Sequence, residues 1–247
     1  MSFYSLIVLI PLAALVSSAF TNGWGAFWRA ATQVEALDAY ELTIGCAVLG
    51  ALINAVSGLG IAWVLARDAF WGKAVLNALI DLPFALPTVV AGVTFYTLYG
   101  PHSPVHLTLT GTWVGITVAV VFVTLPFSVR SVQPVIETMS FTAEGAAATL
   151  GASNTRIFRT ITLPTLLPAI VTGAGLAFAR AMGEYGSVVF ISNNLPFKTQ
   201  VASSYIYSLS SAGDNIGAAA AAVMMMVIAL VALTGISVAS RRLAKGL

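Results

Sequence analysis

The chain has 247 residues, of which 58% are hydrophobic and only 8% are charged, and its mean hydropathy is +0.93. A soluble domain of this length needs far more charge to cover its surface, so the composition excludes an ordinary soluble protein. The formal net charge of +2 is too small to indicate a nucleic-acid partner. The single cysteine, Cys46, excludes an internal disulfide and a cysteine-based metal cluster.

Six apolar stretches along the chain are close to the length of about 20 residues that crosses a bilayer. Each is expected to be a helix, because lipid offers no hydrogen-bond partner to open strand edges. We place them at residues 3–20, 42–66, 74–99, 112–130, 163–191 and 216–239. No internal repeat or low-complexity linker divides the sequence, which predicts one all-α membrane domain over residues 1–247.

The first stretch has a second interpretation as a secretory signal peptide. Ser17, Ser18 and Ala19 form a candidate cleavage point near its end. However, no basic segment precedes the stretch, and its apolar run is longer than that of a usual signal peptide. We therefore predict an uncleaved first helix.

The third stretch contains two prolines, Pro83 and Pro87, a few residues after Asp81. Each proline removes a backbone donor and disturbs the helix bond four residues back, so we expect a bend. The carbonyls freed by a bend need neighbouring helices or water, which is tolerated where a cavity is lined. Asp81 then either lies beside a transport pathway or is a helix-end aspartate near the membrane surface.

The segment from Glu144 to Pro168 reads EGAAATLGASNTRIFRTITLPTLLP and joins the fourth stretch to the fifth. Its small residues give a helix surface that the groove of another protein can approach closely. Gly151 can end this first helix in the left-handed conformation, and Pro164 suits the first turn of the next helix. The pattern predicts a helix-turn-helix that docks a soluble partner, and the alternative is an amphipathic helix lying on lipid headgroups.

Arg180 and Glu184 are charged residues well inside the fifth stretch, four residues apart and therefore on one face of a continuous helix. An unpaired charge at this depth costs at least about 2.5–3.5 kcal/mol, so we expect a partner or a water-filled cavity. Arg180 either lowers the barrier for an anion that crosses the membrane or forms a structural pair. The structural pair is favoured, because a Glu184 carboxylate would repel the anion.

Lysine and arginine residues orient the expected helices by the positive-inside rule. One side carries Arg67, Lys73, Arg130, Arg156, Arg159, Arg241, Arg242 and Lys245, and the other carries only Arg29 and Lys198. Both termini and the 131–162 loop are then cytoplasmic. The loops at 21–41, 100–111 and 192–215 are then external.

Motifs for chemistry within the chain are missing. The sequence has no G-x-x-x-x-G-K-[ST] phosphate loop, no H-E-x-x-H, no nucleophile elbow and no paired-carboxylate site. His102 and His106 are four residues apart, but Pro101 and Pro104 break that segment and no acidic or cysteine ligand is near. We therefore expect no catalytic residue, no metal site and no cofactor bound by this chain.

Several segments resemble a known family. Ala146-Ala147, Gly151, Ile161 and Leu163-Pro164 match the spacing of the EAA signature of binding-protein-dependent ABC importer permeases. The position of the signature glutamate is occupied by Gly145, and Glu144 lies one residue upstream, about 100° away on a helix. The sequences DLPFALPT from Asp81, LPFSVRSVQPV from Leu125 and FARAMGEYGSV from Phe178 are similar to sulfate/thiosulfate permeases of the T type, and the likeness runs through most of residues 40–240.

The resemblance implies a type I ABC importer permease fold, with six transmembrane helices and a cytoplasmic coupling helix, in the bacterial cytoplasmic membrane. It implies that Glu144, Gly145, Ala146, Ala147, Gly151, Ile161, Leu163 and Pro164 couple the chain to an ATPase. The implied partners are two ATP-binding cassette subunits that use ATP and Mg, a second permease subunit, related or identical, and an extracytoplasmic sulfate-binding protein. The implied cargo is sulfate or thiosulfate, with molybdate or tungstate as the alternative, since all are tetrahedral dianions.

Two other functions fit part of the pattern. An ion-coupled secondary transporter working alone would use Asp81, Arg180 and Glu184 as coupling residues. The absence of a detectable repeat and the presence of the EAA-like loop stand against it. A non-transporting membrane scaffold would explain the docking loop but not the charges inside the fifth stretch.

Overall fold

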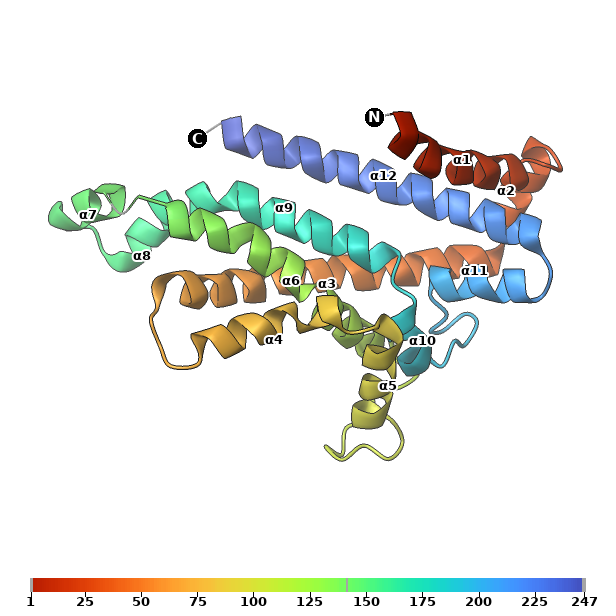
Figure 1. Ribbon diagram of the computed structural model, residues 1–247, viewed down its shortest axis with the longest axis horizontal. Coiled ribbons are helices and arrows are strands. Elements are labelled where there is room, and N and C mark those ends of the chain that lie inside the picture. The colour runs from red at the N-terminus through yellow and green to blue at the C-terminus, as the bar shows by residue number, and fades with distance from the viewer. Residues whose placement is uncertain (1, 141, 246–247) are drawn as a thin grey trace. The chain divides into compact units, whose positions relative to one another are not determined.

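The computed structural model describes residues 2–140 and 142–245, and their regular elements are all helices (Figure 1). Phe141, inside the expected 131–162 loop, and residues 1, 246 and 247, at the ends of the expected domain, lie outside the described residues. The chain divides into two compact units. Unit 1 comprises Met1–Cys46, Thr88–Val120 and Met182–Val231, and unit 2 comprises Ala47–Pro87, Val121–Ala181 and Ala232–Leu247.

The helices follow the apolar stretches but extend into the expected loops. Among the described residues, four stretches are long and apolar enough to cross a membrane, and broken helix pairs raise that number to as many as six. The helices are α1 (Ser2–Ala19), α2 (Trp24–Ala31), α3 (Val34–Arg67), α4 (Lys73–Ala85), α5 (Thr88–Tyr99), α6 (Trp113–Thr138), α7 (Thr142–Thr149), α8 (Asn154–Ile157), α9 (Leu163–Met182), α10 (Gly186–Ser192), α11 (Ala202–Ser211) and α12 (Asn215–Lys245). Thus α2, the start of α3 and α11 are helical where the sequence predicted external loops.

The third expected stretch is two helices, α4 and α5, and the break falls at Pro87. Leu86, just before it, has an extended backbone (φ −81°, ψ 133°), as the residue preceding a proline prefers. Pro83 remains inside the last turn of α4 and is buried. The bend that the two prolines predicted is therefore present as an interruption, and Pro87 accounts for its position.

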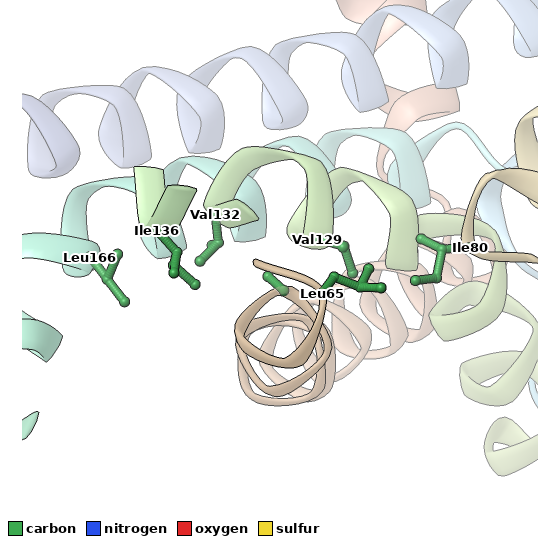
Figure 2. Close-up of a cluster of buried hydrophobic side chains, with 7 residues drawn as sticks. Leu65, Ile80, Val129, Val132, Ile136 and Leu166 are labelled. Atoms are coloured by element: carbon green, nitrogen blue, oxygen red, sulfur yellow. The ribbon is translucent and has the colours of Figure 1, made fainter. Parts of the chain in front are cut away.

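Unit 2 has an apolar core at which α3, α4, α6 and α9 meet, and Figure 2 shows its side chains. Val129, Val132 and Ile136 recur every three or four residues and so lie on one face of α6. Their neighbours in the core are Leu65 of α3 and Leu166 of α9, both fully buried. Within a bilayer, such packing holds helices together through close contact between side chains.

A close approach between α3 and α6 fixes these two helices in unit 2. A Cβ at Gly58 would lie 2.7 Å from the Cβ of Ser128, so no larger residue fits without movement. One turn earlier, the buried Asn54 side-chain amide donates to the Val121 carbonyl at 3.0 Å and to the Thr124 hydroxyl at 2.8 Å. The contact between α3 and α6 therefore depends both on the small residue Gly58 and on the buried polar side chain of Asn54.

Unit 1 contains two further contacts that depend on side-chain size. Helices α1 and α2 are bent by 94° at their junction, where the Phe20 ring stacks on Phe27 with centroids 4.4 Å apart. Helices α5 and α10 pack so closely that a Cβ at Gly186 would overlap the Thr88 hydroxyl. The second halves of the third and fifth stretches thus lie against each other (Figure 1).

The contact between α3 and α6 can be tested by its effect on the stability of the protein. Gly58→Ala should destabilise the protein by about 1–3 kcal/mol, because the added methyl group overpacks the contact with Ser128. Gly60→Ala is the matched control, since a Cβ there meets nothing within 4 Å. The control should be neutral or stabilising by up to about 1 kcal/mol, from helix propensity. The measurement is the thermal unfolding midpoint in detergent, and equal midpoints for the two variants would contradict the contact.

Candidate functional site

Helix α7 and the turn that follows it form the first half of the expected helix-turn-helix (Figure 1). Gly151 has a left-handed backbone with φ +82°. Its N–H donates to the Ala148 carbonyl at 3.0 Å, and the Ala152 N–H donates to the Ala147 carbonyl at 3.0 Å. This is the Schellman arrangement that ends many helices, so the expectation that Gly151 terminates α7 is confirmed.

The second half begins at α8 and continues through a wide helical turn into α9. The Ser153 hydroxyl accepts from the Arg156 N–H at 3.4 Å and so caps α8. Residues Phe158–Thr162 form a π-helix, closed by a bond from the Leu163 N–H to the Phe158 carbonyl. Pro164 explains this wider turn, because a proline lacks the donor for the carbonyl four residues back and its ring clashes with that group.

Glu144 connects α7 to two other elements of unit 2. Its carboxylate accepts two hydrogen bonds from the Arg67 guanidinium at the end of α3, at 3.1 and 3.2 Å. It also accepts one from the Thr162 hydroxyl in the π-helical turn, at 2.7 Å. We call Glu144, Arg67 and Thr162 the α7 junction. A bidentate guanidinium–carboxylate pair fixes geometry as well as charge, so the junction holds α7 in a defined orientation.

Aromatic rings support the arginine of this junction. The Arg67 guanidinium lies 4.7 Å from the ring centroid of Trp63, one turn earlier on α3. Phe158 packs edge-on against Trp63, with the ring centroids 5.8 Å apart. Because the side chains of Arg67 and Glu144 are only 15% and 17% exposed, solvent screens their interaction less than at an open surface.

The charge state of Glu144 follows from these neighbours. Burial raises the pKa of the carboxyl, whereas the Thr162 hydroxyl and the Arg67 guanidinium lower it, and the net pKa lies below the usual glutamate value. Glu144 is therefore ionised at neutral pH and remains a partner for Arg67.

Gly145 and Glu144 differ in their contacts, although they are neighbours on α7. A Cβ at Gly145 would meet nothing within 4 Å, and this residue is exposed, whereas Glu144 faces the protein. The one-residue offset from the EAA signature thus places the carboxylate in an intrachain ion pair. The sequence did not predict this pair, because Arg67 and Glu144 are 77 positions apart.

The exposed part of α7 consists of small residues, and one large apolar side chain, Leu150, directly follows the helix. Ala146 and Ala148 are exposed, and Leu150 is 88% exposed. A cavity of about 480 Å³ lies between α7 and residues of α3, α8 and the π-helical turn, and Ala148 is among the residues that line it. It is lined by Trp63, Glu144, Gly145, Ala148, Asn154, Ile157, Phe158 and Thr162. Of the remaining expected coupling residues, Ile161 and Leu163 are half-buried around the π-helical turn.

Asp81 belongs to a second polar cluster in unit 2, between α4 and α6. The Arg130 guanidinium donates to the Asp81 carboxylate at 2.6 and 2.9 Å and to the side-chain oxygens of Asn77 at 3.0 Å and Gln133 at 2.7 Å. Gln133 in turn donates to Glu137 at 2.9 Å. Asp81 is therefore a partner of Arg130, a residue that the sequence used only for orientation. The Asp81 side chain is 47% exposed and the Arg130 side chain is 32% exposed.

The prediction that Arg180 and Glu184 share a helix face is wrong. Helix α9 ends at Met182, so Glu184 lies outside it. The spacing of four residues therefore does not place the two side chains on one helix face. Glu184 is 3% exposed, and its carboxylate accepts from the Ser187 N–H at 3.0 Å, in the first turn of α10. Its backbone carbonyl accepts from the Ser203 hydroxyl at 2.7 Å. A carboxylate before a helix N-terminus favours starting a new helix, which explains the interruption of the fifth stretch.

His102 and His106 lie in the turns between α5 and α6. Within residues 2–140 and 142–245, no three His, Cys, Asp or Glu side chains gather in a way that could hold a metal ion.

Comparison with known proteins shows the family of the chain. The family described as binding-protein-dependent transport system inner membrane component matches residues 58–245, which include α7 and its junction. The chain belongs to this family. The importer-permease resemblance inferred from the EAA-like spacing is therefore confirmed, and the chain is an inner membrane component with several apolar helices.

Two relatives of this inner membrane component have names that specify sulfate transport. A probable sulfate transport system permease protein cysT of Chlorella vulgaris is 44% identical over 218 residues, covering 85% of this chain and 82% of its own. The sulfate transport system permease protein CysT of Escherichia coli strain K12 is 39% identical over 247 residues, covering 97% and 89%. The resemblance to T-type sulfate permeases is confirmed.

A solved structure shows the same fold. The bacterial alginate ABC transporter in complex with alginate pentasaccharide-bound periplasmic protein contains a chain that matches with a TM-score of 0.80 at 19% identity. The match covers 98% of this chain and 92% of that chain. The expected all-α, type I importer permease fold is thereby confirmed.

Sequence reasoning missed four residues that shape the site of this permease. Arg67, Trp63 and Thr162 make or support the α7 junction, and Leu150 is its exposed apolar side chain. The proximity of Arg67 and Thr162 to Glu144 depends on tertiary structure. Leu150, by contrast, was open to prediction, because a leucine beside a helix-ending glycine in a polar loop has few ways to be buried.

The α7 junction should respond to acid. Because the folded pKa of Glu144 is lowered, the ion pair contributes its full stability above the usual glutamate value of about 4.3. This stability is lost as the pH falls through the lowered folded value. Hydrogen exchange of residues 142–162, corrected for intrinsic rates, should therefore accelerate in a step below about pH 4.3.

Glu144→Gln should abolish this step and raise the exchange at neutral pH. Gly145→Ala should keep it, because a Cβ there meets no neighbour. An unchanged step in Glu144→Gln would assign the titration to another group.

Proposed function

We propose that this chain is the permease subunit of an ATP-driven ABC importer that carries sulfate or thiosulfate into the cytoplasm. The observation that carries the proposal is 39–44% identity, over most of the chain, to proteins named as sulfate transport system permeases. Molybdate and tungstate are alternative cargoes, because they are tetrahedral dianions as well. The chain has no ATPase site of its own, and ATP and Mg act in partner subunits.

The proposed coupling site is the outer surface of α7 with the turn at Gly151. Ala146 and Ala148 allow close approach of an ATPase groove, and the exposed Leu150 provides an apolar anchor. The α7 junction gives the movement a route into the membrane part, because Arg67 is the last residue of α3 and Thr162 directly precedes α9. ATP-driven displacement of α7 would then move both spans, in a rigid-body change of the type that opens and closes transporters.

The proposed assembly contains two ATP-binding cassette subunits, a second permease subunit, related or identical, and an extracytoplasmic sulfate-binding protein. The family description names a binding-protein-dependent system, and the alginate transporter of the same fold was solved with a periplasmic protein. The six proposed spans of one membrane domain are α1, α3, α4 with α5, α6, α9 with α10, and α12. Positive residues at the ends of these spans favour cytoplasmic termini.

The route of the anion is a separate proposal, with Asp81, Pro83, Pro87, Arg180 and Glu184 as candidates. Asp81 is paired with Arg130 and the Glu184 carboxylate accepts a hydrogen bond from a backbone N–H, so both also have structural roles. Arg180 is proposed as a candidate for a direct effect on the anion because it is a positive charge within the fifth stretch. Arg180→Gln with normal sulfate uptake at a normal protein level would remove it from the route.

Uptake of labelled sulfate into proteoliposomes tests the function. The assembled complex should import sulfate only when ATP and the ATPase subunits are present, and unlabelled thiosulfate should compete. Molybdate competing more strongly than sulfate would favour the alternative cargo. Uptake by this chain alone, driven by an ion gradient, would instead support a secondary transporter and overturn the proposal.

Leu150 tests the coupling site. Leu150→Ser should lower ATP-dependent uptake by about tenfold, because loss of one exposed apolar anchor at an interface costs more than about 1 kcal/mol. Leu150→Met is the matched control, since it keeps an apolar side chain of similar size, and it should retain most of the activity. The uptake rate at a measured amount of assembled complex is the readout. Equal uptake by the serine and methionine variants would show that Leu150 is no anchor.

A further inference from the structure

A cavity of about 210 Å³ in unit 2 lies between α9 and α12 and has no part in the α7 junction. Its lining residues are Thr172, Gly175, Leu176, Leu233, Ile236, Ser237, Ser240 and Arg241. The two helices run antiparallel here, because Gly175 contacts Ile236 and Thr172 contacts Ser240. The absence of a side chain at Gly175 brings the helices together at the middle of the cavity.

The chemistry of the lining changes from apolar to cationic along α12. Leu233 and Ile236 come first, the hydroxyls of Ser237 and Ser240 follow, and Arg241 is last. At 1.5 Å per residue, this sequence from Leu233 to Arg241 extends over about 12 Å of helix. The lining residues of the antiparallel α9 change in the same direction, from Leu176 to Thr172. The cavity therefore has an apolar end and a polar, basic end.

The polar end is held in place and carries positive charge. The Thr172 hydroxyl donates to the Pro168 carbonyl at 2.7 Å, and the Ser240 hydroxyl donates either to the same carbonyl, at 3.1 Å, or to the Thr172 hydroxyl oxygen, at 2.9 Å. No carboxylate is among the lining residues, and neither of the ion pairs described for unit 2 uses Arg241. Arg241 is exposed and followed by a second exposed arginine, Arg242. The basic end thus attracts an anion that no residue of the lining supplies.

We infer that this cavity binds the phosphate group of an anionic phospholipid. Arg241 presents a planar set of N–H donors that suits phosphate oxygens, and the Ser237 hydroxyl lies one turn before it. The first part of the acyl chains lies along Leu176, Leu233 and Ile236. The order from acyl chain to ester to phosphate in such a lipid matches the order of apolar, hydroxyl and cationic residues in the cavity. Basic residues at the cytoplasmic end of a membrane span attract anionic lipids for the same reason.

A free inorganic anion fits the cavity less well than a lipid. Sulfate or phosphate would use the basic end, but it would leave the apolar end without a matching partner. Leu176 is 46% exposed, so the apolar end is open to the acyl region. The inference concerns α9 and α12 alone and is independent of which anion the importer carries.

Native mass spectrometry of the detergent-solubilised, assembled importer tests the inference, with phosphatidylglycerol as the probe and phosphatidylcholine as the neutral lipid. The wild-type complex should retain phosphatidylglycerol in preference to phosphatidylcholine. Arg241→Gln should weaken phosphatidylglycerol binding by more than about tenfold, because it removes a charge-assisted hydrogen bond to the phosphate as well as a surface charge. Arg242→Gln is the matched control, because it removes an adjacent exposed charge outside the cavity lining, and it should lower binding by at most about fivefold, the effect of one basic residue near the membrane surface.

The remaining outcomes also decide the inference. Equal losses in the two variants would mean diffuse attraction to the basic C-terminal end and would overturn a specific site. Displacement of phosphatidylglycerol by millimolar inorganic sulfate or phosphate would assign the cavity to a free anion.

If Arg241→Gln fails to assemble, Ser237→Leu replaces it, since it fills the polar part of the cavity and keeps both arginines. Loss of lipid binding in Ser237→Leu supports the site, and unchanged binding contradicts it. Sulfate uptake plays no part in this readout, so failure of the lipid site and failure of the transport proposal are distinguishable.

Discussion

The bidentate ion pair between Glu144 and Arg67 is the contact on which the rest of the candidate site depends. Helix α7 has only eight residues and an exposed outer surface, so it cannot hold its own orientation by packing. The ion pair and the Thr162 hydroxyl fix it to the end of α3 and to the turn that leads into α9. Trp63 and Phe158 reduce the freedom of the arginine. A short helix that is anchored in this way keeps one orientation, whereas a loosely attached one would not.

Prolines and glycines set the positions of the other functional features. Pro87 interrupts the third stretch and Pro164 widens the turn before α9, since neither residue can donate a backbone hydrogen bond. Gly58 allows α3 and α6 to approach closely within unit 2, and Gly151 ends α7 because it adopts a left-handed backbone. In a bilayer, where apolar side chains gain little from leaving lipid, such local shape has a larger influence on packing than hydrophobicity has.

Charged side chains in unit 2 are arranged in pairs and networks. Asp81 and Arg130 connect α4 to α6, and the network continues through Gln133 to Glu137. In unit 1 the Glu184 carboxylate receives a backbone N–H at the start of α10. Charge near or inside a membrane is costly when it is unpaired, so these contacts explain how the chain accommodates the polar residues of its third and fifth stretches. Arg241, at the end of α12, differs because no carboxylate lines its cavity.

Sequence alone determined the membrane class, the approximate helical stretches, the helix-turn-helix with its end at Gly151, and the family. These features are encoded by residues that are close together in the chain: apolar runs, prolines, glycines and the EAA-like spacing. Only the tertiary structure decided that Glu144 pairs with Arg67, that Asp81 pairs with Arg130, and that Glu184 lies beyond the end of the helix that contains Arg180. The first two pairs join residues 77 and 49 positions apart, and such partners depend on how helices pack. The third result depends on where α9 ends. The buried Glu184 carboxylate accepts a backbone hydrogen bond at the start of α10, and the apolar pattern of the fifth stretch did not indicate this interruption.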